Sequence, residues 1–162
     1  MAGIKKIFVT GITSKLKSTE QTDTLGDIRL ENGKFYKYVN FNQATMTATA
    51  GDCVAYIGST GYVSNVVTVD YSEAGVKRIG AGIVGVAIST SEDRYIWIQI
   101  KGLATVATAL GGSATDGSEL VLEGAANAAM DMLVKSTGAT QETVFAIAED
   151  ATAKTIICDF PF

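Results

Sequence analysis

The chain is a succession of short runs of β-branched and aromatic residues, separated by glycine, asparagine, aspartate and threonine. The strongest boundary is Asn32-Gly33, which lies between residues 28–30 and residues 35–41. Both central positions of a type I′ turn need a positive φ, which asparagine and glycine adopt readily, so this dipeptide predicts a β-hairpin. Apolar and polar side chains alternate in the second run, as is typical of a β-strand.

Similar runs continue to the end of the chain. Residues 94–101 form the clearest one, with three isoleucines on one face and Tyr95, Trp97 and Gln99 on the other. Further strands are predicted over residues 53–57, 62–69, 79–89, 105–109, 119–122, 131–134, 144–148 and 155–160, with residues 58–61 as a tight glycine turn. At most one short helix is expected, over residues 124–134, where alanine and methionine favour it, or over residues 42–48.

This order of elements predicts an all-β fold, a small antiparallel β-barrel or sandwich. Residues 1–24 are rich in lysine, serine and threonine and are interpreted as an extended N-terminal arm; residues 25–162 are interpreted as a single β-barrel-like domain. A domain of this length can bury its own core. No apolar run is long enough for a secretory signal or a membrane span, so neither is expected.

Composition indicates association with other chains. Hydrophobic residues make up 47% of the sequence and charged residues 19%, against about 25% charged residues in typical soluble domains. Because few charges are available to cover the outside, some apolar surface is expected to lie against another chain. A homo-oligomer is therefore expected.

Positive charge is concentrated at the N-terminus. Lys5, Lys6, Lys15 and Lys17 are the only charged residues among the first 19. The remainder holds 9 basic residues (13 minus 4) and 17 acidic ones, a net charge of −8. The arm is therefore expected to reach an acidic protein surface. Nucleic acid is not an expected partner, because the arm has no arginine and a single aromatic residue, Phe8.

The sequence offers little for catalysis. Histidine is absent, which removes the commonest general base and zinc ligand, so no enzymatic activity, cofactor or metal is expected. Residues 80–85 (Gly-Ala-Gly-Ile-Val-Gly) match the dinucleotide-binding pattern, but a strand-like run follows them where that motif needs a helix, so closely packed strand glycines are the preferred interpretation. Cys53 and Cys158 lie in apolar runs and are expected to be small buried side chains, compatible with a reducing compartment.

The C-terminal residues are unusually apolar. Phe160 and Phe162 flank the only proline of the chain. Burying a phenylalanine is worth about 1.5–3 kcal/mol, so both side chains are expected to be covered. The tail either closes the protein's own barrel or fills a pocket on a neighbouring subunit, in which case Phe160 and Phe162 are subunit-interface residues.

Six stretches are typical of one known family: residues 25–29 (Leu-Gly-Asp-Ile-Arg), 33–39, 51–54 (Gly-Asp-Cys-Val), 79–82, 95–102 and 158–162 (Cys-Asp-Phe-Pro-Phe). In these stretches, which extend over most of the chain from Leu25, the sequence resembles the head decoration, or capsid cement, proteins of tailed bacteriophages. The resemblance is one of pattern and includes no catalytic motif.

The resemblance implies small β-barrel-like subunits, commonly trimers, that bind the outer surface of the phage head and bridge capsomers to stabilise the shell. It implies the major capsid protein as partner, a place in the virion after assembly in the host cytoplasm, and no membrane association. In such proteins an N-terminal arm often adds a strand to the major capsid protein. The candidate capsid-contact residues are then Ile4, Lys5, Lys6, Ile7, Phe8, Val9, Thr10, Lys15 and Lys17.

Two other function classes stay open. A virion-associated β-domain could recognise a glycan or receptor through an exposed aromatic platform of Tyr36, Tyr38, Tyr95 and Trp97. A barrel enzyme, such as a nucleotide hydrolase, is the third class.

Overall fold

The computed structural model describes residues 11–12, 17–42, 47–72, 79–89, 95–124, 131–135 and 143–161. In these ranges the elements are β1 (Lys17–Ser18), β2 (Ile28–Glu31), β3 (Lys34–Phe41), β4 (Cys53–Tyr56), α1 (Gly58–Ser64), β5 (Val66–Thr68), β6 (Gly80–Val84), β7 (Tyr95–Thr105), β8 (Glu119–Glu123), β9 (Asp131–Val134), β10 (Ala146–Asp150) and β11 (Thr155–Asp159).

Five strands close into a barrel. β3, β5, β4, β6 and β7 follow one another around it, and pairing between β3 and β7 closes the ring. Four of these five contacts are antiparallel. The contact between β3 and β5 is parallel, with Asn40 opposite Val66. The predicted all-β barrel with at most one short helix is confirmed, and the one parallel pairing is an addition to it.

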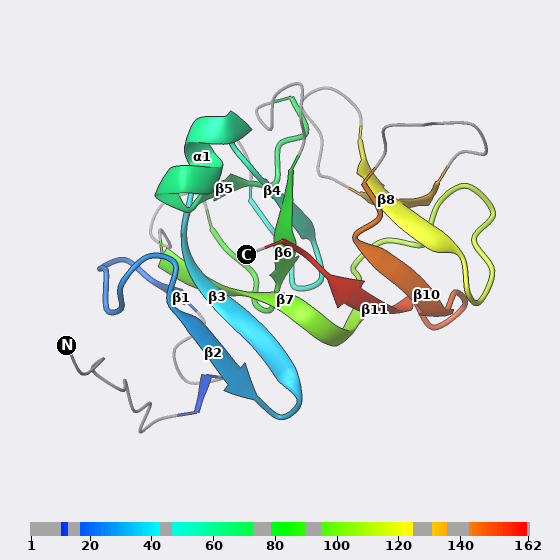
Figure 1. Cartoon of the computed structure of the whole chain (residues 1–162), viewed down its shortest axis with the longest axis horizontal. Coiled ribbons are helices and arrows are strands. Elements are labelled where there is room, and N and C mark those ends of the chain that lie inside the picture. Colours follow the sequence, from blue (N-terminus) through cyan, green and yellow to red (C-terminus); the bar gives the residue numbers. More distant parts are fainter. Residues whose placement is uncertain are drawn as a thin grey trace.

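β7 belongs to both parts of the molecule. Its first half completes the barrel, and its second half pairs with β11, with Leu103 opposite Ile157. An outer sheet then continues through β10, β8 and β9. Figure 1 shows the barrel strands beneath α1 and the outer sheet extending away from them through β11, β10 and β8.

The main core fills the barrel and extends beneath the outer sheet. Ile96, Ile98 and Ile100 lie in this core, as the predicted alternation requires. The opposite face of β7 is also buried, because Trp97 packs there against Tyr38 in a second, smaller cluster. From Ile96 to Ile100, β7 is therefore covered on both faces.

The hairpin predicted from Asn32-Gly33 is present. β2 and β3 are antiparallel, with Glu31 opposite Lys34. Asn32 and Gly33 have φ values of 50° and 76°, as a two-residue turn of type I′ requires.

The glycines of residues 80–85 allow close packing and are followed by no helix. A Cβ atom at Gly82 would lie 2.7 Å from the Gln99 carbonyl oxygen, and one at Gly80 would lie 2.9 Å from Leu122 Cδ1. β6 ends at Val84, and the next pairing is an isolated bridge at Ile88. The pyrophosphate-binding arrangement is not formed here.

The predicted glycine turn at residues 58–61 and the start of the predicted strand at residue 62 are wrong, because α1 occupies residues 58–64. The helix ends where Asn65 adopts a left-handed φ of 58°, a common way to end a helix. Its Tyr62 packs edge-on against the ring of Tyr56, 5.1 Å away. The predicted helix positions are not borne out where they are described, because Ala48 forms a β-bridge and residues 131–134 form β9.

Candidate interaction surface

The predicted contact arm falls mostly outside the described residues. Residues 4–10 and Lys15 lie there, and so does Phe162, the second predicted interface residue of the C-terminal tail. Lys17 is exposed in β1 and pairs through its backbone with Ile96 of β7. Two points of the arm interpreted as residues 1–24 contact the body: Ile12 is buried beside Tyr38 and Trp97, and the Thr22 amide donates a hydrogen bond to the Tyr38 hydroxyl at 3.0 Å.

Phe160 is buried in its own chain, as expected if the tail closes the protein's own barrel, the first of the two predicted roles. Its ring stacks on that of Phe145 with centroids 5.5 Å apart. Its amide donates to the Ile100 carbonyl at 2.9 Å. The tail up to this residue therefore joins the outer sheet to the barrel core, and the side chain has almost no surface left for a neighbour.

The aromatic platform is also corrected. Tyr38 and Trp97 are buried, with ring centroids 5.1 Å apart, and Ile12 and Leu25 pack against them. Tyr36 and Tyr95 are only partly exposed. The four aromatic side chains therefore do not form an open surface on which a sugar ring could stack.

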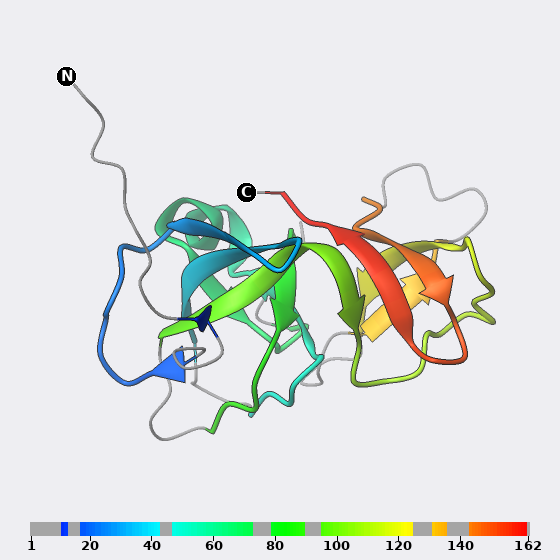
Figure 2. The same cartoon turned by 90° about the horizontal axis from the view of Figure 1, so that it is seen from below.

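A row of exposed aliphatic side chains crosses the outer sheet. Leu103 of β7 lies opposite Ile157 of β11, which lies opposite Ile147 of β10. Residues directly opposite one another in neighbouring strands point to the same face. The three side chains are 50%, 53% and 47% exposed, and Figure 2 shows their three strands side by side. We call this row the aliphatic stripe.

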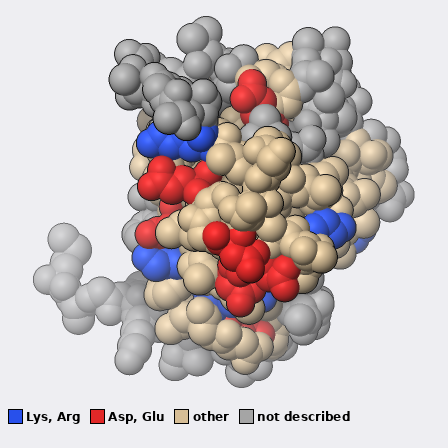
Figure 3. All heavy atoms as spheres, turned by 90° about the vertical axis from the view of Figure 1, so that its right-hand side faces the viewer, with Lys and Arg blue, Asp and Glu red and all other residues tan. Residues whose placement is uncertain are grey.

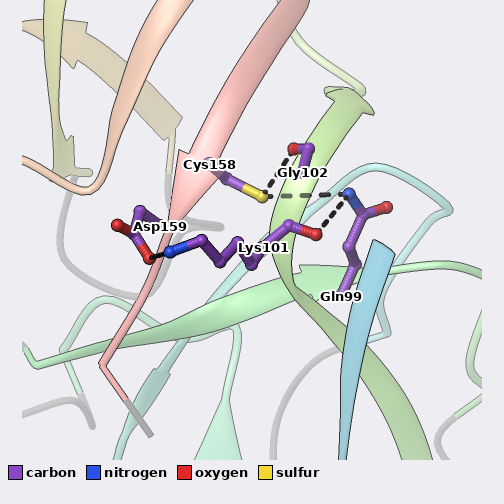
Figure 4. A network of polar contacts seen from close by, with 5 residues as sticks. All are labelled: Gln99, Lys101, Gly102, Cys158 and Asp159. Carbon is purple, nitrogen blue, oxygen red and sulfur yellow. Dashed lines mark hydrogen bonds and ion pairs between the residues drawn. The ribbon is translucent and has the colours of Figure 1, made fainter. Parts of the chain in front are cut away.

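Polar contacts fix the strands on which the aliphatic stripe is built. Gly102 has a φ of 102° where β7 leaves the barrel, and its carbonyl accepts a bond from the Cys158 thiol at 3.2 Å. Gln99 Nε2 donates to the Leu103 carbonyl at 2.9 Å. Lys101 Nζ and Asp159 Oδ1 form an ion pair at 3.0 Å. Figure 4 shows the contacts of Gly102 with Cys158 and of Lys101 with Asp159, which link β7 to β11.

The aliphatic stripe has polar borders on both sides. On one side are Lys101 and Asp159, and on the other the Thr155 hydroxyl donates to the Glu149 carboxylate. Beyond Asp159 lies an open hollow of about 430 Å³, whose lining also includes Val144 and Pro161. An apolar centre with a polar rim is the usual composition of a protein–protein contact.

Carboxylates gather at the far end of β10. Asp116 and Asp150 accept backbone hydrogen bonds from Ala151 and Ala153 at 3.0 Å and 2.8 Å, and Glu149 directly precedes Asp150 in β10. Figure 3 shows acidic side chains grouped near the centre of this side of the molecule. A partner on this side would therefore meet negative charge next to the aliphatic stripe.

Buried titratable groups are found inside the barrel and at the junction between β7 and β11. Lys37 Nζ donates to the Tyr56 hydroxyl at 2.8 Å and lies 5.1 Å and 5.7 Å from the ring centroids of Tyr56 and Tyr62. Burial lowers the pKa of Lys37 and raises the pKa of Tyr56. Burial also raises the pKa of Cys158 to about 11. Cys53 and Cys158 are both buried, as predicted.

Within the described ranges, no cluster of three or more histidine, cysteine, aspartate or glutamate side chains could hold a metal ion. No helix in those ranges is long and apolar enough to cross a membrane. The aliphatic stripe was missed by sequence reasoning because Leu103, Ile147 and Ile157 are 10 to 54 residues apart in the chain. Their only sequence signal is an aliphatic residue at an outward position of each strand.

Comparisons of the chain with protein-family models, with curated proteins and with solved structures found no match.

Proposed function

We propose that the protein is a structural capsid decoration, or cement, protein that binds the outside of a phage head and bridges capsomers. The proposal makes it a non-enzymatic component of the virion, assembled in the host cytoplasm, with the major capsid protein and further copies of itself as partners. The observation that carries the proposal is the aliphatic stripe, which leaves Leu103, Ile147 and Ile157 uncovered on a sheet that polar contacts hold in place. The sequence resemblance gives this adhesive surface its proposed partner.

The free energy gained by covering the aliphatic stripe fits an adhesive protein that acts in several copies. Each stripe side chain is about half exposed, so covering it is worth about half of the 1.5–3 kcal/mol of full burial, or about 2–4 kcal/mol for the three. That energy alone gives weak binding. An oligomer that docks several stripes together gains affinity through effective concentration, without any new kind of contact.

Co-sedimentation with phage heads tests the proposal. Empty heads are assembled from the major capsid protein of the same genome and mixed with the wild type, with Ile157→Lys or with Val63→Lys. Val63 is the matched control, because it is 81% exposed on α1 and lies outside the aliphatic stripe. The wild type and Val63→Lys should sediment with the heads, and Ile157→Lys should lose at least about tenfold in affinity, since about 1.4 kcal/mol corresponds to tenfold.

Absence of wild-type binding to these heads would reject the proposed function. Equal binding by Ile157→Lys and the wild type would reject the aliphatic stripe as the contact. Circular dichroism and the melting temperature of each variant check that the fold is retained.

A further inference from the structure

The outer edge of β2 is open in the described structure. β2 pairs with β3 and stands at the end of the strand order. The Tyr38 amide donates a hydrogen bond to the Asp27 carbonyl. Because inward and outward main-chain groups alternate along an antiparallel pair, the N–H and C=O groups of Ile28 and Leu30 point away from β3. Among the described residues, no strand or side chain bonds to those outward groups.

The two exposed side chains of this edge are aliphatic, whereas Arg29 and Glu31 alternate with them on the other face. Ile28 and Leu30 are 42% and 61% exposed. Natural sheets usually protect an edge with lysine, proline, a bulge or a covering segment. Ile28 and Leu30 each offer one main-chain donor and one acceptor, so the edge can form up to about four hydrogen bonds. Such an edge is suited to an added strand.

The segment of the chain that ends in β2 is acidic, which favours a basic strand as the addition. Residues 20–31 contain four acidic residues (Glu20, Asp23, Asp27 and Glu31) and one basic residue (Arg29), a net charge of −3. The chain itself contains a segment that matches: residues 4–10 carry two lysines and no acid. Ile7 and Val9 have the same two-residue spacing as Ile28 and Leu30, so all four side chains can share one face of a paired sheet.

The position of Ile12 favours a segment from another copy. Its amide bonds to both carboxylate oxygens of Glu31 at 3.1 Å and 3.0 Å, and its side chain is buried beside Tyr38 and Trp97. Glu31 alternates with Leu30, so Ile12 lies over the face of β2 opposite the one that Leu30 occupies. Within one chain, residues 4–10 are joined through Gly11 to Ile12, which is held on that opposite face. A second copy has no such restriction.

We propose that residues 4–10 of one copy add as a strand to the free edge of β2 in a second copy. Ten residues precede Gly11, enough for an extended reach of about 33 Å. Repeated in one direction, the exchange links copies into a ring or chain, and reciprocal exchange gives a dimer. This assigns the arm a partner different from the shell that the sequence resemblance implies, and it uses a surface distinct from the aliphatic stripe.

Disulfide trapping between differently tagged chains tests the proposal. Val9→Cys on one chain and Leu30→Cys on the other are mixed under mild oxidation; native Cys53 and Cys158 are buried and do not compete. A disulfide joining the two tags is expected. Val9→Cys mixed with Val63→Cys is the control and should give at most a tenth of that yield. Absence of the mixed disulfide, or equal yield in the control, would overturn the proposal.

Two further measurements separate the alternatives. The double variant Val9→Cys with Leu30→Cys should form no disulfide within one chain at high dilution; an intrachain product there would overturn the proposal by placing the arm on its own β2. Leu30→Lys should shift the mass in solution towards the monomer, whereas Leu103→Lys on the aliphatic stripe should not, and an unchanged mass for Leu30→Lys contradicts the exchange. No phage heads are present in these assays, so their failure is distinguishable from failure of the proposed function.

Discussion

Gly51 and Gly117 require glycine for different physical reasons. Both have left-handed backbones, with φ values of 95° and 84°. A Cβ atom at Gly51 would lie 2.6 Å from the Ala107 amide nitrogen, whereas a Cβ atom at Gly117 would meet nothing within 4 Å. Backbone strain acts at both positions, and steric overlap acts only at Gly51.

Substituting alanine at each position measures the two effects. Gly117→Ala should lower the free energy of unfolding by about 1–2 kcal/mol, the usual difference for a left-handed residue with a Cβ atom. Gly51→Ala should lower it by a further ~1–3 kcal/mol or more, because backbone atoms must move. Urea denaturation of both variants gives the comparison. Equal losses would show that the close approach at Gly51 is not maintained.

Lys37 gives the barrel a dependence on pH. Burial lowers its folded-state pKa below the ordinary value of 10.5. Below the folded pKa both states carry the charge and the burial penalty is fully present. Between the folded pKa and 10.5 the unfolded chain binds the proton that the folded chain has lost, so stability contributed by this residue rises with pH.

The variant Lys37→Met removes this charge and keeps an unbranched apolar side chain. The unfolding free energy of the wild type minus that of Lys37→Met should increase from about pH 7 to about pH 10. Denaturant titrations of both proteins across this range supply the difference, in which effects of the other titrating groups largely cancel. Parallel pH profiles would contradict a lowered lysine pKa.

β11 and the residue after it join the outer sheet to the barrel. Phe160 stacks on Phe145 while its amide bonds to the Ile100 carbonyl. Phe160→Ala should therefore lower the unfolding free energy by about 3–5 kcal/mol, the usual loss for a buried aromatic residue. Ile157→Ala, on the exposed face of the same segment, should lose less than about 1 kcal/mol. Chemical denaturation of the two variants tests the difference, and similar losses would contradict the observed packing.

The strands were largely predictable because their signals are local. Asn32-Gly33 identifies a turn by its backbone requirement, and the predicted strand at residues 131–134 coincides with β9. α1 was missed because glycine, serine and threonine disfavour a helix, and its stability comes from tertiary contact between Tyr62 and Tyr56. The burial of Trp97 was missed for the same reason, since Ile12 and Leu25 cover it from distant positions in the chain.

The candidate surface was less predictable than the fold. The alternation along each strand gives the outward positions, but the aliphatic stripe exists only because β7, β11 and β10 lie in register. That register depends on long-range pairing and on the bend of β7 at Gly102. For Phe160 the sequence left a core role and an interface role open, and in the structure its side chain belongs to the protein's own core.

The whole molecule has a closed barrel joined to an outer sheet, and we expect the outer sheet to be the side that faces a partner. The barrel supplies a stable body, because closure leaves its five strands without free edges. The outer sheet carries the aliphatic stripe and the neighbouring hollow. This arrangement allows adhesion without any change in the fold, so decorated and free subunits should have the same backbone structure.

Electron cryomicroscopy of phage heads decorated with the protein tests this account. The β7–β11–β10 face should lie against the shell, with Leu103, Ile147 and Ile157 covered by the major capsid protein and with one subunit in contact with more than one capsomer. A map of saturated heads in which this face points to solvent, or heads that carry no added density at all, would contradict it.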